Sequence, residues 1–401
     1  MLKKEKQKKV KVVKAKEKKI VKSPKKLIVA DKKLSRGKIA EKKIIKKSAK
    51  KVNKLDLFTR SAENPIISSI PTNNWELWQT FNPAAILLDD KVHFLYRALG
   101  GDGISRWGYA NSNDGFLINE RISYPVYEHQ VGQVPVFNIY SYSSGGGWGG
   151  AEDPRIVRVG KEDVLYVTYT ACDQGLRIAL TSIKIEDFLN QKWNWKKPIL
   201  ISPPNANNKN WVIFPEKING KYAILHRIYP EIFIDYIDSL SEFNGVKFIE
   251  NTSSDHGGLG YFNKNFKKKE NWEKRIKGAG SPPIKTKYGW LLFYHGIDDE
   301  GGKYKVGAML LDLKNPTKIL HRAKKPVFEP ETHYELNGNK SGMTYVSGAV
   351  VKDGLLFLYY GGADSYVCVA YAHFEEFVEA LVRENSPKLK IKTKFGKIKK
   401  C

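Results

Sequence analysis

The 401-residue sequence predicts an all-β fold made of repeated units, on two observations. Between residues 55 and 387, short apolar runs rich in Val, Ile, Tyr and Phe alternate with Gly, Asn and Asp turns, a pattern typical of β-strands. A unit of proline, apolar strand, tight polar turn and second strand also recurs. Its equivalent positions are Pro83, Pro154, Pro215, Pro283 and, in a degenerate fifth copy, Ala349, with spacings of 71, 61, 68 and 66 residues.

Each copy predicts a strand pair, and most copies predict a further strand. The copies read "FNPAAILLDDKVHFLYRA", "AEDPRIVRVGKEDVLYVTYTA", "IFPEKINGKYAILHRI", "GSPPIKTKYGWLLFYHGI" and "VSGAVVKDGLLFLYYGGAD". Four of them continue into "SRWGYANS", "LRIALTSI", "YKVGAMLLD" and "YVCVAYAHF". A sheet of about four strands cannot bury both faces alone, so we expect residues 55–387 to form a five-bladed β-propeller. The stretch "HFEEFVEALVREN" has helical spacing and predicts a short C-terminal helix.

The positive charge of the chain is confined to its two ends. Residues 1–54 contain 24 Lys and Arg against 4 Asp and Glu, and residues 388–401 contain 7 Lys and no acid. The whole chain has a formal net charge of +26, so the segment 55–387 has a net charge of only −1. The first tail has no aromatic residue, so we expect it to be disordered. It is a candidate for contact with nucleic acid or anionic surfaces, as an alternative to a merely solvated tail.

Several classes of protein are not supported by the sequence. There is no run of 18 apolar residues, which argues against a membrane span, and no apolar signal-peptide core follows the N-terminal charges. Three scattered cysteines predict neither a disulfide framework nor a zinc site, so we expect a cytoplasmic protein without a bound metal. No P-loop, dinucleotide-binding glycine motif or nucleophile elbow is present. A homo-oligomer is left open.

The repeat alignment indicates where chemistry could lie. In a propeller the first strand of each blade lines the central channel, and the five residues before the equivalent positions are Asn82, Asp153, Phe214, Pro282 and Gly348. Only Asp153 among them is ionisable, which makes it the candidate catalytic acid. The ends of the second strands carry Arg97, Thr170, Arg227, His295 and Asp364. We therefore predict a pocket with one acid, a second acid opposite and several cations.

Structural roles are the alternatives for these residues. An Asp-Pro pair is often a local backbone cap, a buried arginine is often half of a structural ion pair, and His295 could be a core histidine rather than a sugar ligand. Trp107 and Trp148 are predicted in loops, where an indole ring could stack on a sugar.

The ordered set of motifs resembles glycoside hydrolase family 130, five-bladed propeller enzymes that include β-mannoside phosphorylases. The matching stretches span about residues 60–372 and include "ENPIISS", "GGAEDPRI", "FPEKINGKYAILHR", "WEKRIKGAGSPPI", "LLFYHGI" and "LLFLYYGGADSYVCVA". The resemblance implies that Asp153 is the catalytic acid. It also implies that Arg227, Lys277 and Tyr304 bind inorganic phosphate and that Asn82, Arg97 and Asp364 hold the mannosyl unit. The segment "QKWNWKKPILISPPNANNKNW" is longer than the family pattern.

The implied reaction is an inverting phosphorolysis of β-mannosides that needs phosphate as co-substrate and no cofactor. An anionic nucleophile makes a second carboxylate superfluous, and Arg227 and Lys277 would position it. Asp153 would then need a pKa high enough to keep its proton. A hydrolase of the same family, or a non-catalytic sugar-binding propeller, is the alternative. The acceptor sugar and the linkage are left open.

Overall fold

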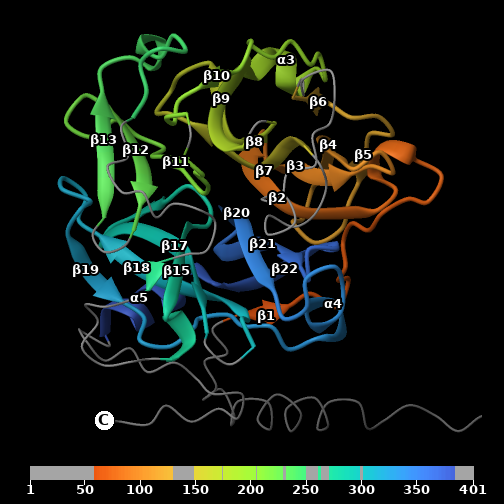
Figure 1. Cartoon of the computed structure of the whole chain (residues 1–401). Helices are drawn as coiled ribbons and strands as arrows, with labels where there is room; N and C mark the ends of the chain where they lie inside the picture. Colours follow the sequence, from red (N-terminus) through yellow and green to blue (C-terminus); the bar gives the residue numbers. More distant parts are fainter. Residues whose placement is uncertain are drawn as a thin grey trace, which may run out of the picture. The chain divides into compact units, whose positions relative to one another are not determined.

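The computed structural model describes residues 58–129, 149–173, 175–204, 206–228, 232–249, 261–262, 271–298 and 301–383. By its internal contacts the chain divides into two units, Met1–Val52 and Asn53–Cys401, and every described residue belongs to the second. This unit is built mostly of antiparallel β-strands, as Figure 1 shows. The all-β prediction is confirmed at this level, whereas the two predicted tails lie outside the described residues.

The N-terminal half forms one sheet with two antiparallel parts. One part contains β2 (Gln79–Leu88), β3 (Lys91–Leu99), β4 (Ile104–Ser112), β5 (Glu120–Arg121) and β6 (Tyr127–Glu128). The other contains β7 (Gly149–Arg158), β8 (Val164–Cys172), β9 (Leu176–Lys184) and β10 (Ile199–Leu200). The only link between the two parts within the described strands is a short parallel pairing of β4 with β7 at two residues.

Three further sheets follow along the chain. The first contains β11 (Val212–Ile213), β12 (Tyr222–Arg227) and β13 (Phe233–Ile237). The second contains β14 (Tyr261–Phe262), β15 (Arg275–Ala279), β16 (Ile284–Thr286), β17 (Gly289–Ile297), β18 (Tyr304–Leu311) and β19 (Ile319–Arg322). The third contains β20 (Thr344–Lys352), β21 (Leu355–Gly362), β22 (Tyr366–His373) and β1 (Thr59–Arg60). Thus β1, from the start of the described chain, completes the last sheet by pairing with β22.

Helices are few and short within the described residues. They are α3 (Ile185–Leu189), α4 (His333–Leu336), α5 (Phe374–Arg383) and the 3₁₀ turns η1 (Asn74–Glu76), η2 (Leu240–Glu242) and η3 (Asn271–Glu273). The predicted C-terminal helix is confirmed as α5. Its apolar face buries Phe377, Val378 and Leu381 against the last two sheets. None of the described helices is long and apolar enough to cross a membrane.

Tight turns join the paired strands, and their residues explain them. The two-residue turns between β2 and β3, before β12, and between β20 and β21 have positive φ at both positions, a geometry that Asn, Asp and Gly tolerate best. These turns are Asp89-Asp90, Asn219-Gly220 and Asp353-Gly354. The polar turns of the sequence repeat are therefore hairpin turns.

At least one hydrophobic cluster joins each group of paired strands to the next group along the chain. Trp107 and Tyr169 belong to the cluster that joins β2–β4 to β7–β9. The others join β7–β9 to β11–β13, β11–β13 to β15–β18, β17–β18 to β20–β22 and β20–β22 back to β2–β4. Each sheet thus packs against the next in sequence, and the last sheet packs against the first.

A buried cluster of one Glu, one Tyr and one Arg recurs in three of the sheets, and we call these the Glu–Tyr–Arg clusters. In each, the tyrosine hydroxyl donates to the carboxylate, and the arginine bonds the same carboxylate. Their members are Glu76, Tyr96 and Arg121; Glu273, Tyr294 and Arg322; and Glu335, Tyr360 and Arg60. In the first two, a glycine lies opposite the tyrosine on the next strand, where a Cβ would come within 2.4 Å of the ring.

Candidate functional site

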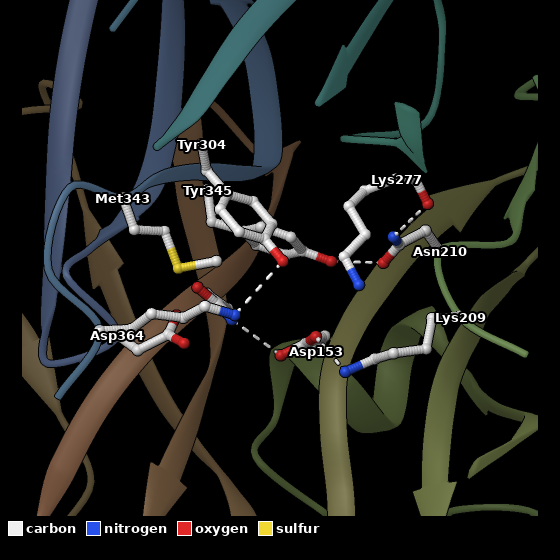
Figure 2. A pocket seen from close by; sticks show the side chains of 10 residues that line it. Asp153, Lys209, Asn210, Lys277, Tyr304, Met343, Tyr345 and Asp364 are labelled. Carbon is white, nitrogen blue, oxygen red and sulfur yellow. Dashed lines mark hydrogen bonds and ion pairs between the residues drawn. The ribbon is translucent and has the colours of Figure 1, made fainter. Parts of the chain in front are cut away.

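A pocket of about 320 Å³, part of it open to solvent, gathers polar side chains from five strands (Figure 2). Its walls come from β2, β7, β15, β18 and β20, from the end of β21 and from two loops. The lining residues are Asn82, Asp153, Lys209, Asn210, Lys277, Tyr304, Lys340, Met343, Tyr345 and Asp364. Two carboxylates and three lysines therefore face one small space, which matches the kind of pocket that the repeat alignment predicts.

Four of the lining residues adopt left-handed backbone geometry. The φ angles are 46° at Asn82, 47° at Asp153, 64° at Asn210 and 50° at Asp364. Asn and Asp tolerate this region better than other residues with a Cβ, although it still costs free energy. At Asn82 and Asp153 the strained residue sits in a β-bulge of the first strand of its sheet. The bulge turns the side chain from the strand face into the pocket, which is why Asn-Pro and Asp-Pro occupy these positions.

Asp153 is almost fully buried and surrounded by donors. Its Oδ1 accepts from Asn82 Nδ2 at 2.8 Å and lies 3.2 Å from Arg97 Nη1, and its Oδ2 lies 3.4 Å from Lys209 Nζ. Burial alone would raise the pKa of this carboxyl, but the charges of Lys209, Arg97 and Arg155 outweigh burial and hold the pKa well below its usual range. The prediction of a raised pKa for Asp153 is therefore wrong for the arrangement described, because the cations lie closer than the repeat alignment indicated.

Glu152 shares the same cations from the other side. Its Oε1 lies 3.0 Å from Arg97 Nη2, and its Oε2 lies 3.2 Å from Lys209 Nζ. Burial would lower the pKa of Lys209, yet Glu152 and Asp153 raise it above its usual value. Two buried carboxylates thus bracket two buried cations, and the anionic partners required for a buried Arg97 are present.

Lys277 and Lys340 lie across the pocket from this network. No carboxylate of the described residues is within ion-pair distance of either ammonium group. Burial lowers the pKa of Lys277 well below its usual value, and the charges of Lys340 and Lys209 lower it further. Lys340 Nζ donates to Tyr304 Oη at 3.3 Å and lies 4.5 Å from the centre of the Tyr304 ring. This side of the pocket has excess positive charge, which an anion would offset.

Asp364 and Asn82 each present an unsatisfied oxygen. Among the described residues, neither Asp364 Oδ1 nor Asn82 Oδ1 has a hydrogen-bond partner, although both are buried. Burial raises the pKa of Asp364, and the charge of Asp153 adds to this effect while Lys340 opposes it. Buried polar atoms are nearly always hydrogen-bonded, so unpaired oxygens at a pocket wall indicate a place for ligand hydroxyls.

Most of the residues predicted from sequence are brought together. Asn82, Asp153, Lys277, Tyr304 and Asp364 line the pocket. Arg97 is fully buried behind Asp153, which it contacts directly. Trp148 lies outside the described residues.

Arg227 and His295 are not among the pocket-lining residues. Arg227 follows a bulge on β12, and its guanidinium lies 3.5 Å from the centre of the Phe233 ring. His295 is fully buried with its ring stacked on Tyr345 at 4.2 Å, and Tyr345 is the residue that faces the pocket. Burial, with the charge of Arg155, lowers the pKa of His295 to about 3, so the ring is neutral at ordinary pH.

One aromatic prediction is wrong. Trp107 was expected in a loop, but it lies within β4, is fully buried and stacks on Tyr127 with ring centres 4.1 Å apart. Its neighbours are core residues of the cluster between the first two strand groups. Trp107 therefore has no surface to offer a sugar.

Sequence reasoning missed half of the pocket. Lys209 and Asn210 belong to the segment that departs from the family pattern, and Lys340 and Met343 lie in the loop before β20. Tyr345 lies two residues into β20, just before the start of the fifth repeat copy. Asn210 accepts from Tyr345 Oη and donates to the Lys277 carbonyl at 3.0 Å, so it joins three walls. A lysine in a polar loop gives no pattern from which its place could be predicted.

Comparisons with known proteins find relatives that are named as phosphorylases. The sequence model of a family described as beta-1,4-mannooligosaccharide phosphorylase matches residues 48–383. A 1,2-beta-oligomannan phosphorylase of Thermoanaerobacter sp. (strain X514) is 35% identical over 79% of this chain and 97% of its own length. A beta-1,2-mannobiose phosphorylase of the same strain is 33% identical over 80% and 98%.

A solved structure shares the fold. The crystal structure of a glycosyl hydrolase from Bacteroides ovatus superimposes with a TM-score of 0.60 at 26% identity, covering 79% of this chain and 94% of the other. In the described part of the chain, no group of three or more His, Cys, Asp or Glu side chains is placed to hold a metal ion. With the family match covering the whole described unit, this chain belongs to glycoside hydrolase family 130.

Proposed function

We propose that this chain is an inverting phosphorylase of β-mannosides, which uses inorganic phosphate to release α-mannose 1-phosphate and a shortened glycan. The observation that carries the proposal is the pocket, in which buried Asp153 contacts Lys209 and faces Lys277 and Lys340. Relatives that match almost over their whole length are named as phosphorylases of β-linked mannosides.

The mannosyl unit is held by the oxygen-rich wall. Asn82 and Asp364 carry the unpaired oxygens there, which suits the hydroxyl donors of a sugar. Arg97 acts from behind, because it is fully buried and fixes the position of Asp153. His295 supports Tyr345 rather than touching the sugar, and a contact from Trp148 stays a prediction.

Phosphate occupies the lysine-rich side. Lys277 and Tyr304 line it as the family resemblance implies, and Lys209 and Lys340 extend the set. A buried ammonium group with a lowered pKa gains most from a nearby anion, which makes Lys277 the strongest candidate. Arg227 is proposed as an outer contact, since it lies at the end of β12 rather than on the pocket wall.

The reaction then needs one acid. A phosphate oxygen attacks the anomeric carbon as the bond from that carbon to the leaving oxygen breaks, so the configuration inverts from β to α. The leaving oxygen receives the proton of the Asp153 carboxyl, through a sugar hydroxyl if the family resemblance holds. The lysines hold the phosphate in line and offset its charge. No cofactor is required beyond phosphate as co-substrate.

Hydrolysis is the competing reaction, favoured by the name of the Bacteroides ovatus neighbour. Water needs a general base, and the two remaining carboxylates of the site suit that role poorly. Glu152 is paired with both Arg97 and Lys209, and Asp364 is assigned in this proposal to a hydroxyl of the mannosyl unit. A sugar-binding propeller without catalysis would not need three lysines in the pocket. Phosphorolysis accounts for more of the side chains than either alternative.

The linkage is proposed as β-1,2. The description of the family names β-1,4-mannooligosaccharides, whereas the two relatives matched at 97% and 98% of their length are named for β-1,2-linked substrates. The test is to incubate the protein with β-1,2-mannobiose, β-1,2-mannotriose or β-1,4-mannobiose, each with and without phosphate. Mannose 1-phosphate that forms only with phosphate, and fastest from the β-1,2 substrates, is expected. Equal release of free mannose in both conditions would contradict the phosphorylase.

The sheets are proposed to be five blades around one axis. The support is the run of five hydrophobic clusters, each between consecutive strand groups, with the fifth returning from β20–β22 to β2–β4. The two parts of the first sheet count as separate blades because only a short parallel pairing joins them.

The location of the enzyme in the cell and the contacts of its Lys-rich tail are proposed mainly from the sequence. A cytoplasmic location fits the buried thiols of Cys172 and Cys368, and the Lys-rich tail is proposed to contact nucleic acid or another anionic surface. Removing residues 1–54 is expected to leave turnover unchanged while weakening retention on heparin. Loss of turnover would instead mean that the tail contributes to the active site.

Whether the protein forms a homo-oligomer can be measured by light scattering.

A further inference from the structure

Lys209 is held by two carboxylates at once. Its Nζ lies 3.2 Å from Glu152 Oε2 and 3.4 Å from Asp153 Oδ2, and it also lines the pocket. Figure 2 shows its ammonium group directed toward Asp153. A cation shared in this way has a third possible partner in any anion that enters the pocket.

The groups that face Asp153 favour its carboxylate form. From its own strand come Glu152 and Arg155, and from other elements come Arg97, Lys209, Lys277, Lys340, His295, Tyr345 and Asp364. Arg97 and Lys209 lie within ion-pair distance of the Asp153 carboxylate, and Arg155 donates to the Asp153 backbone carbonyl. Asn82 also donates a hydrogen bond to the carboxylate. Such a carboxyl gives up its proton, although the proposed reaction requires it as an acid.

An anion reverses this balance. Phosphate held by Lys209 and Lys277 adds negative charge beside Asp153 and takes up the positive charge that now serves the carboxylate. Lys209 need not leave the pocket to do so, because it lines the pocket while it contacts both carboxylates. Glu152 then retains Arg97, so the Arg97 guanidinium stays in place.

We propose that phosphate and a proton bind together in this site: the anion takes Lys209 from Asp153, and Asp153 accepts from solvent the proton that it later donates. This inference rests on the proposed phosphorylase function. The proton moves from water to an Asp153 oxygen as phosphate enters, and from there toward the leaving oxygen as the glycosidic bond breaks. That second transfer restores the carboxylate, and Lys209 returns to it when the sugar phosphate leaves. Lys209 is thus a positioning residue that makes the acid available only when the nucleophile is present.

Inorganic sulfate is the probe, because any proton taken up when it binds must be taken up by the protein and not by the anion. It resembles phosphate in size and charge but has no proton to exchange between pH 5 and 7, whereas phosphate titrates there. Isothermal titration of sulfate into the full-length protein at pH 5, 6 and 7, in two buffers of different ionisation enthalpy, gives both affinity and proton uptake. Coupling to one proton predicts an affinity that rises about tenfold for each pH unit of decrease, with uptake approaching one proton.

Three variants test which side chain accepts the proton when sulfate binds. Asp153→Asn is expected to bind sulfate with little uptake and a flat pH dependence. Lys209→Met is expected to bind more weakly and with less uptake, since Asp153 is then protonated more easily before the anion arrives. Lys277→Met keeps most of the uptake, because the proton goes to the carboxyl rather than to this amine. The exposed Lys318→Met serves as the matched control and behaves as the wild type.

The outcomes separate this inference from the proposed function. Sulfate or phosphate that binds without proton uptake, or uptake that survives Asp153→Asn in full, overturns the coupling and leaves the phosphorylase intact. A protein that binds neither anion and forms no mannose 1-phosphate from β-mannosides refutes both. If Asp153→Asn does not fold, Lys209→Met decides, because unchanged uptake in that variant also overturns the coupling.

Discussion

Buried charged side chains occur in two kinds of place in this molecule, and they differ in whether all of the charged groups have partners of opposite charge. In the Glu–Tyr–Arg clusters, one buried carboxylate accepts hydrogen bonds from both a guanidinium and a tyrosine hydroxyl. In the pocket, Lys277 and Lys340 face no carboxylate at ion-pair distance among the described residues, and the oxygens of Asp364 and Asn82 are unpaired. Because their charges are paired, the Glu–Tyr–Arg clusters should stabilise the fold. Because several of its polar groups are not paired in this way within the described chain, the pocket should bind a ligand.

Backbone geometry separates the two places as well. The pocket contains four Asn or Asp residues with left-handed φ angles, whereas no member of a Glu–Tyr–Arg cluster within the described chain has a positive φ. Strain persists where the surrounding structure enforces it, and it is common at functional sites. Changes in the pocket should therefore reduce activity, and changes in the clusters should reduce stability.

The largest expected effect is on turnover. Asp153→Asn keeps the shape of the side chain but removes the acid, so kcat for phosphorolysis is expected to fall by about 10²–10⁴-fold. Initial rates of mannose 1-phosphate formation measure this. Asp163→Asn, at a fully exposed carboxylate, is the control and should keep wild-type rates. Turnover of Asp153→Asn near the wild-type value would assign the acid elsewhere.

The next effect is on stability alone. Glu76→Gln leaves Arg121 without its buried carboxylate, and the expected loss in the free energy of unfolding is about 3–5 kcal/mol. Urea denaturation measures it, and kcat of the folded fraction should not change. Glu128→Gln breaks the exposed pair with Arg106 and should cost about 1 kcal/mol or less. Equal losses in both variants would mean that burial of the cluster is irrelevant.

A third effect links stability to pH through His295, which lies behind the pocket-lining Tyr345. The pKa of His295 in the folded chain is about 3, below the ordinary value of about 6.5. The neutral ring therefore stabilises the fold above about pH 6.5, and this contribution is lost as pH falls toward 3. Between pH 7 and 5 the free energy of unfolding should fall by about 2 kcal/mol more in the wild type than in His295→Gln. Parallel pH profiles from urea denaturation would contradict the lowered pKa.

The smallest effect concerns the nucleophile. Lys340→Met removes one of the three lysines, and the Michaelis constant for phosphate should rise about tenfold while that for the mannoside changes little. Steady-state kinetics with each substrate varied in turn separates the two, with the exposed Lys318→Met as control. A rise confined to the mannoside constant would place Lys340 on the sugar side, beside Asp364.

The regular part of this molecule could be predicted from sequence, and the irregular part could not. Strand periodicity and turn residues predict the sheets, and the equivalent positions around the repeat predict Asn82, Asp153 and Asp364 at one pocket. The same alignment misplaces His295 and Arg227, because equivalent backbone positions do not fix side-chain direction: His295 stacks against Tyr345, and Arg227 follows a bulge on β12.

Loops account for what was missed. Lys209, Asn210 and Lys340 lie in connections without periodicity, and only packing against distant strands brings them to the pocket. The Asn-Trp-Glu tripeptide at residues 74–76 and 271–273 was a readable signal, since both copies form a 3₁₀ turn that supplies the acid of a Glu–Tyr–Arg cluster.

The pairing of β1 with β22 has a consequence for synthesis of the protein. Thr59 lies opposite Tyr371 and Arg60 opposite Ala370. β1 is therefore synthesised first among the described strands but can pair only after β22, the last of them, has been made. Contacts of such long separation form late and slow the folding of a domain. On the ribosome, the earlier sheets can pair as they emerge, but β1 lacks its partner β22 until residue 373 is released. A nascent chain stalled before that point exposes an unpaired edge, which makes it a substrate for chaperones.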